Sequence, residues 1–152
     1  MSCVPSDLLI SVIFVNWNNS KDLLTSFEAN SNIVDFQRPN LIKIIVDNNS
    51  INEEYEKLGK LISEHQFKEV NSIDQIELGD RNILFRSKEN MGFVGGNNLG
   101  IKISQILNSK FYWLLNTDAE IEDSTLKNLY FAIQEYDADI CGSFIYYYKN
   151  RT

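Results

Sequence analysis

Polar residues of the types that bind ligands gather in four short segments of this 152-residue chain. Each segment follows an apolar run with the length and composition of a buried strand. In open α/β sheets ligands bind beyond the carboxyl ends of the strands, so the sequence predicts one site built from all four segments. The segments are Asn16-Trp17-Asn18, Asp47-Asn48-Asn49-Ser50, Asn90 to Asn98, and Asn116-Thr117-Asp118.

Asp47 places a carboxylate at the end of its apolar run. Acidic residues at such positions in dinucleotide-binding folds accept hydrogen bonds from a ribose, so Asp47 is a candidate for holding a nucleoside. A structural interpretation competes with this one. The segment Asp-Asn-Asn-Ser is also typical of a turn whose side chains hydrogen-bond their own backbone.

Three glycines, Gly92, Gly95 and Gly96, fall within five residues. Glycine lets backbone N–H groups approach a ligand closely, and a helix N-terminus directly after such a loop favours an anion. The spacing matches neither the P-loop, which needs Gly-Lys-Ser/Thr, nor the dinucleotide motif G-x-G-x-x-G. The alternative is a tight connection between a strand and a helix.

Asp118 offers a hard oxygen ligand of the kind that Mg²⁺ or Mn²⁺ takes together with substrate phosphates. The charge balance supports a cation here. The chain has 21 acidic and 14 basic residues, a net charge of −7, and only Arg86 and Lys88 lie near these motifs in the sequence. The alternative places Asp118 or Asp123 at the N-cap of the next helix, which does not exclude a metal role.

The elements that must position these segments follow from the spacing of apolar residues. Strands and helices alternate, which predicts an α/β fold with a mostly parallel sheet. The stretch 66–80 fits neither period, and we expect an acidic surface excursion there. Predicted strands cover 8–15, 41–46, 82–85, 111–115 and 140–148, and predicted helices cover 21–30, 52–65, 97–107 and 123–136.

Length and composition predict a single domain over residues 1–152. The negative net charge argues against a non-specific nucleic-acid binder and against docking on anionic lipid through a basic patch. The longest apolar run is far shorter than the ~20 residues of a membrane span. The two cysteines, Cys3 and Cys141, match no metal or redox spacing, which favours a reducing, cytoplasmic compartment.

Taken together and in this order, the four segments resemble the family 2 glycosyltransferases of GT-A fold, in particular their rhamnosyltransferase-like branch. The pattern there runs "VNYN", "VDNGS", "NxGFAGGNNxGI" and "LLNPD". The resemblance extends from Leu8 to about Tyr148 and implies a Rossmann-like nucleotide-binding sheet. The matching stretches are Val12 to Asn18, Ile45 to Ser50, Asn90 to Gly100, and Leu114 to Asp118.

The resemblance also implies an activity and its ligands. The reaction would be a metal-dependent, inverting transfer of a sugar from a nucleotide-diphospho-sugar to a glycan or lipid-linked acceptor, in polysaccharide biosynthesis. The donor would be a UDP- or dTDP-sugar rather than a GDP-sugar. Mn²⁺ or Mg²⁺ would bridge the diphosphate and act as a Lewis acid on the departing nucleotide.

Each segment takes a role from the same resemblance. The nucleoside would be held at the first two segments, the diphosphate and donor sugar at the glycine-rich segment and Asn116, and the metal at Asp118. In full, the nucleoside set is Asn16, Trp17, Asn18, Asp47 and Asn49, and the diphosphate and sugar set is Gly92, Gly95, Gly96, Asn97, Asn98 and Asn116.

Three departures from the family pattern matter. Asn49 replaces the usual glycine of "DNGS", and Asn tolerates left-handed backbone angles. Asn116 stands where the first Asp of the D-x-D motif often is. Only 34 residues follow Asp118, whereas the family's general base lies far beyond that motif. We therefore expect the base to lie beyond Thr152 and this chain to be a C-terminally truncated donor-binding half that is inactive alone.

The alternative function is a non-catalytic nucleotide or nucleotide-sugar binding module. A donor-binding half would expose the sheet surface that the rest of the enzyme covers, so we expect self-association through that surface. We expect no nucleic-acid partner. The full-length protein would be cytoplasmic, peripheral to the inner face of a membrane.

Overall fold

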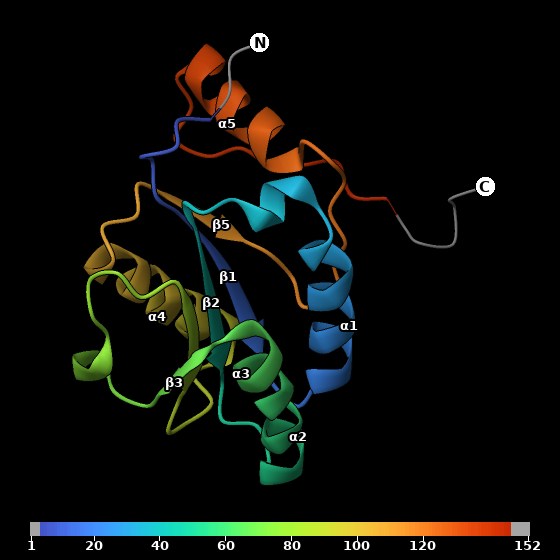
Figure 1. Cartoon of the computed structure of the whole chain (residues 1–152), viewed down its shortest axis with the longest axis vertical. Coiled ribbons are helices and arrows are strands. Elements are labelled where there is room, and N and C mark those ends of the chain that lie inside the picture. Colours follow the sequence, from blue (N-terminus) through green and yellow to red (C-terminus); the bar gives the residue numbers. More distant parts are fainter. Residues whose placement is uncertain (1–3, 147–152) are drawn as a thin grey trace.

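The computed structural model describes residues 4–146, and it contains one five-stranded sheet in the order β3-β4-β2-β1-β5 (Figure 1). Every neighbouring pair of strands in it runs parallel, which confirms the predicted α/β class. The carboxyl ends of the strands therefore meet at one edge. The strands are β1 (Ile10–Asn16), β2 (Leu41–Asp47), β3 (Lys68–Val70), β4 (Asn82–Arg86) and β5 (Phe111–Leu114).

Helices cover both faces of the sheet, as Figure 1 shows. One face carries α1 (Ser20–Ser31), α2 (Asn52–Lys57) and α3 (Gly59–His65), and the other carries α4 (Gly92–Ile106). At the end of the molecule remote from α2 lies α5 (Thr125–Tyr136), beside the short 3-10 helix η1 (Val34–Gln37). None of the helices in residues 4–146 is long and apolar enough to cross a bilayer.

The core lies on both sides of β1 and β2, which is why their sequences are almost continuously apolar. Val12 and Phe14 on β1 belong to the cluster under α1, whereas Ile13 belongs to the cluster under α4. All three side chains are fully buried. The strand predicted over 8–15 and that predicted over 41–46 are thereby confirmed to within two residues at each end.

The structure differs from the sequence-based expectation in two neighbouring stretches. The helix expected over 52–65 is divided at Leu58 into α2 and α3, with Gly59, a poor helix former, beginning the second. The stretch 66–80, for which the sequence predicts an acidic surface excursion and no particular element, contains the edge strand β3 and the 3-10 helix η2 (Ile73–Gln75). A strand of three residues is too short for its alternation to stand out in the sequence.

The glycine-rich segment is helical, which corrects the prediction of a loop running into a helix at residue 97. Helix α4 begins at Gly92, five residues earlier. Gly96 and Gly100 both lie against β1, and a methyl group added at either would overlap the side chain of Val15 or Ile13, respectively. Tertiary packing thus overrides the low helix propensity of glycine.

The last predicted strand, 140–148, is not formed over residues 140–146, and residues 147 and 148 lie outside the described part of the chain. In this segment Ile140, Phe144 and Ile145 are almost fully exposed, so no sheet face buries them. Edge strand β5 also exposes Tyr112 and Leu114. Self-association through exposed apolar surface stays a prediction.

Candidate functional site

A cavity of about 290 Å³ opens at the carboxyl edge of the sheet, where β1 and β5 end beside the first turns of α4. Three of the four polar segments or their immediate neighbours contribute to its wall. The lining residues are Val15, Asn19, Phe93, Asn97, Leu114, Leu115, Asn116, Thr117 and Asp118. The segment 47–50 is absent from this wall.

Asp118 and Asn116 are exposed and face this cavity directly after β5. The competing interpretation of Asp118 or Asp123 as a helix N-cap is wrong, because the residue before α5 is Ser124. Asn30 of α1 holds the chain that follows Asp118. Its Nδ2 donates to the carbonyl of Ala119 at 3.0 Å, and its Oδ1 accepts from the N–H of Ile121 at 2.9 Å. Sequence reasoning missed this anchor.

The donor set of the cavity fits a hard divalent cation that is shared with a ligand. Asp118 supplies a carboxylate, and Asn116 and Thr117 supply side-chain oxygens beside it. No group of three or more His, Cys, Asp or Glu gathers anywhere in residues 4–146, so a site made only of such ligands is absent there. Mg²⁺ is commonly bound in this way, through one or two carboxylates with water and substrate phosphates completing its shell.

Only part of the glycine-rich segment faces the cavity. Phe93 and Asn97 lie one turn apart on α4 and line the wall, and Asn97 Nδ2 donates to the carbonyl of Phe93 at 2.9 Å. Gly96 packs on Val15 and Asn98 is exposed outside the wall. Gly92, at φ +71°, begins the helix, and its backbone N–H donates to Asn90 Oδ1 at 2.9 Å.

Asn48 fixes the start of α4, a role that sequence reasoning did not assign. Its Nδ2 donates to Asn90 Oδ1 at 2.8 Å and to the carbonyl of Gly92 at 3.0 Å, and its Oδ1 accepts from the N–H of Met91 at 3.0 Å. The side chain is buried. One amide therefore joins the end of β2 to the first turn of α4, and so sets where Phe93 and Asn97 lie.

Asp47 is fully buried beside the cavity and is bonded within the protein. Its Oδ1 accepts from Asn16 Nδ2 at 3.0 Å and from Ser50 Oγ at 2.6 Å, and its Oδ2 accepts from the N–H of Ser50 at 3.1 Å. These bonds occupy three of about four lone-pair positions of the carboxylate. The turn interpretation of Asp47 is thus realised, and its role toward a nucleoside stays a prediction.

The remaining residues of the first two segments lie outside the cavity wall. Trp17 is 56% exposed. Asn18 holds the two segments together, since its N–H donates to Ser50 Oγ at 2.8 Å and its Oδ1 accepts from the N–H of Ile51 at 2.8 Å. Asn49 is exposed with φ 62°, the left-handed angle that its position in the motif requires.

Replacing Asp47 with Ala is expected to lower the free energy of unfolding by about 1–3 kcal/mol, because buried donors of Asn16 and Ser50 lose their acceptor. Asp47→Asn keeps one oxygen acceptor and should cost less. Urea denaturation of both variants measures the difference. Equal stability of the Ala variant and the wild type would contradict a structural role for the carboxylate.

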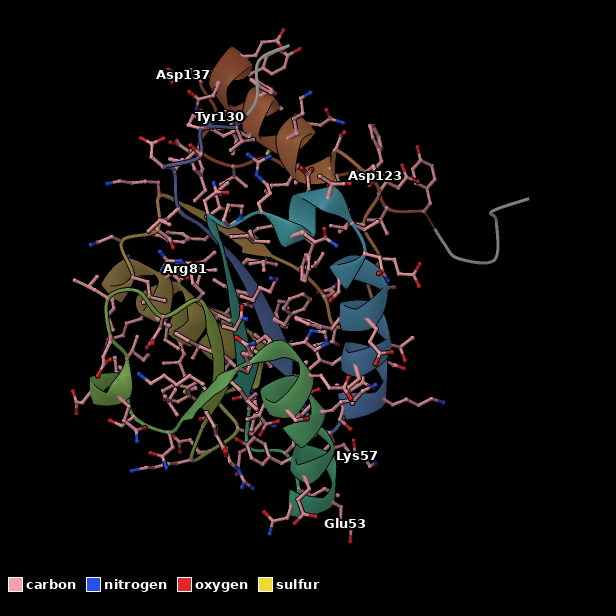
Figure 2. All side chains as sticks on the ribbon, in the orientation of Figure 1. Glu53, Lys57, Arg81, Asp123, Tyr130 and Asp137 are labelled. Atoms are coloured by element: carbon pink, nitrogen blue, oxygen red, sulfur yellow. The ribbon has the colours of Figure 1, made fainter. Side chains whose placement is uncertain are left out.

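Glu54 anchors the N-terminus of α1, next to the cavity residue Asn19. Its carboxylate accepts hydrogen bonds from the backbone N–H and the hydroxyl of Ser20. It also forms an ion pair with Lys57, which lies on the same helix, α2 (Figure 2). Hydrogen bonds from Lys57 and from Ser20 lower the pKa of Glu54 from its ordinary 4.5 to about 2.

This lowered pKa predicts a pH dependence of folding. Because the folded pKa lies below the unfolded one, the stabilisation is complete above pH 4.5 and is lost as the pH falls toward about 2. Glu54→Gln should therefore flatten the acid limb of the stability curve, followed by denaturant titration between these pH values. An acid limb identical to that of the wild type would contradict the anchor.

Comparison with known proteins gives one family and several solved structures. The family model described as "Glycosyl transferase family 2" matches residues 11–152. TarS 1-349 of S. aureus is 18% identical with a TM-score of 0.62, over 87% of this chain. The mannosyltransferase PcManGT from Pyrobaculum calidifontis, solved with GDP-Man and Mn²⁺, is 15% identical with a TM-score of 0.61, over 86% of this chain. No curated protein sequence matches significantly.

This chain spans about a third of those structures, namely 34% of TarS 1-349 and 36% of the mannosyltransferase. A further TarS structure, in complex with UDP-GlcNAc, gives a TM-score of 0.57 at 18% identity and is covered to 33%. At these identities the likeness concerns the fold, and it agrees with the parallel sheet and the helices on both of its faces described above.

Proposed function

Because this chain belongs to glycosyl transferase family 2, we propose that it forms the donor-binding part of a glycosyltransferase that uses a nucleotide-diphospho-sugar. One observation carries the proposal. The cavity at the carboxyl edge of the sheet joins the end of β1, the first turns of α4 and the segment Asn116 to Asp118. This edge is where open α/β sheets bind their ligands.

The diphosphate and the donor sugar are assigned to this cavity. Asp118 and Asn116 would hold Mn²⁺ or Mg²⁺, which would act as a Lewis acid on the departing nucleoside diphosphate. Asn97 of α4 lies in the same wall, whereas Gly92, at the start of this helix, lies outside the lining residues. We assign Gly95 and Gly96 a structural role in this proposal, because each lies against the side chain of another residue.

The nucleoside is assigned to the adjacent pair of segments 16–18 and 47–50. Asn16 Oδ1 supports this, because it is a buried acceptor with no hydrogen-bond partner in the described part of the chain. Trp17 presents an exposed ring beside it. Asp47→Ala is then expected to weaken binding of nucleoside mono- and diphosphates, beyond its effect on stability. Titration with UDP, dTDP and GDP tests our expectation that uridine or thymidine is preferred.

The acceptor half and the general base are proposed to lie outside these residues. The support is the coverage of about a third of TarS and of the mannosyltransferase. An inverting mechanism needs a base that takes the acceptor proton as the anomeric carbon is attacked, and such a base contributes about 10²–10⁴-fold. The acceptor is proposed to be a glycan or a lipid-linked saccharide. The proposed setting is cytoplasmic, at the inner face of a membrane in the full-length protein.

A radiolabelled-donor assay tests the proposal. The 152-residue chain is expected to bind nucleotide-sugar in the presence of Mn²⁺ and to transfer no sugar to an added acceptor, while the full-length protein transfers it. Absence of nucleotide-sugar binding by the chain would reject the donor-binding role. Binding without transfer by the full-length protein would favour the non-catalytic binding module.

A further inference from the structure

A second cavity, of about 150 Å³, lies on the α1 face of the sheet, away from the carboxyl edge. It opens between the end of α1, η1, the end of α3 and the starts of β2 and β4. Its residues are Phe27, Ser31, Phe36, Gln37, Lys43, His65 and Asn82. This set contains two groups that can carry positive charge and no carboxylate.

Lys43 is the unusual residue of this cavity. It occupies the third position of β2, between Leu41 and Ile45, whose side chains belong to the core cluster on this face. Its ammonium lies 5.2 Å from the centre of the Phe36 ring. Within residues 4–146 it forms no ion pair and no side-chain hydrogen bond. Burial without a compensating charge lowers its pKa.

Two side-chain amides in the wall, those of Gln37 and Asn82, retain unused hydrogen-bond donors, whereas the hydroxyl of Ser31 donates to the carbonyl of Phe27 at 2.7 Å. Gln37 Nε2 donates to the carbonyl of Ser31 at 2.8 Å, and Asn82 Nδ2 donates to the carbonyl of His65 at 2.8 Å. A side-chain amide has two N–H groups, so each retains one. The His65 ring packs edge-on against Phe27, with the ring centres 4.9 Å apart.

Nearby acidic residues are engaged elsewhere. Glu28 pairs with Lys60, and Glu64 lies 3.8 Å from the same ammonium. Asp35 of η1 accepts from the N–H of Lys127 at 3.2 Å and pairs with Arg38. The ammonium of Lys43 therefore has no counter-charge of its own in the described chain, although taking a charge out of water is costly.

We propose that this cavity is a binding site for a small oxyanion, of the phosphate or short-carboxylate type, with the Lys43 ammonium as its counter-charge. Gln37, Asn82 and His65 add hydrogen-bond donors around it. The volume is well below the ~300 Å³ at which pockets for drug-sized ligands begin, so the ligand is small. Lys43 precedes Asp47 by four residues, roughly 13 Å along an extended strand, which separates this site from the proposed nucleotide site.

Thermal shift measurements with inorganic phosphate test the proposal. Phosphate and, separately, acetate are titrated at constant ionic strength set with NaCl, on the wild type, Lys43→Met and Lys102→Met. Lys102 is an exposed residue of α4 on the opposite face, and its replacement changes the net charge equally. We expect saturable stabilisation by at least one anion in the wild type and Lys102→Met, and an affinity roughly tenfold or more weaker in Lys43→Met.

A nuclear magnetic resonance titration of the lysine ammonium groups keeps the test independent of stability. A bound anion should raise the pKa of Lys43 and leave that of Lys102 unchanged. The presence of UDP and Mn²⁺ should not compete with the anion, which separates this site from the nucleotide site. Non-saturable shifts, shifts of equal size in Lys43→Met, or a Lys43 pKa that phosphate and acetate leave unaltered would overturn the proposal.

Discussion

Replacing Asp118 with Asn is expected to abolish the Mn²⁺-dependent part of the stabilisation that a nucleoside diphosphate gives this chain. Asn keeps the size of the side chain but removes the negative charge that attracts a hard cation. With ligand at ~100 times its dissociation constant, the wild type should gain about 2.7 kcal/mol. Thermal unfolding with UDP, in the presence and absence of Mn²⁺, measures this gain.

Asp123→Asn provides the matched control for Asp118→Asn. Asp123 is exposed, lies outside the cavity wall and stands near the start of α5 (Figure 2). Its replacement changes the net charge by the same amount, so it should keep the full Mn²⁺-dependent shift. Because Asp118 is itself exposed, neither variant should lose stability without ligand. If Asp118→Asn retains the whole shift, the metal assignment is wrong.

Replacing Gly96 or Gly100 with Ala is expected to destabilise the fold, by about 1–3 kcal/mol each. In an open helix the same change would be favourable by up to ~1 kcal/mol, because Ala is the better helix former. Here the new methyl would overlap the side chain of Val15 or Ile13 in the contact between α4 and β1. Urea denaturation of each variant measures the loss.

Gly59→Ala is the control for the helix contact. Gly59 begins α3, and nothing lies within 4 Å of the position that its methyl group would take. This variant should therefore be as stable as the wild type or more so. A gain in stability for Gly96→Ala and Gly100→Ala comparable to that of Gly59→Ala would show that α4 does not pack closely on β1.

The positions of the strands were predictable because burial on both faces leaves a local signature. Runs such as 10–15 and 41–46 are apolar with hardly a break, and the residues after them can be recognised as the edge where a ligand binds. The placement of Asp118 after β5 followed from the same reasoning. Edge strand β3 could not be predicted in this way, because only Val70 of its three residues is buried and the other two are Lys68 and Glu69.

The purposes of individual residues were harder to predict. Gly96 in the sequence is compatible with a phosphate-binding loop and with a close helix contact, and only the position of Val15, about eighty residues away in the chain, distinguishes them. Asp47 can hold a ribose or close a turn, and the buried bonds to Asn16 and Ser50 show the second use. Asn48 carries no sequence signal for its bonds to residues 90–92.

The sequence by itself determined the α/β class, the order of most strands and helices, the family, and the edge of the sheet where polar groups gather, because the pattern of apolar residues reports burial locally. The tertiary structure alone decided which polar groups share a wall. In the structure Asn19, Asn97 and Asp118 line one cavity, and Asp47 is buried in a hydrogen-bonded network. Lys43 lies in a second cavity and has no counter-charge in the described chain. Such arrangements depend on contacts between segments far apart in the chain, which no local pattern encodes.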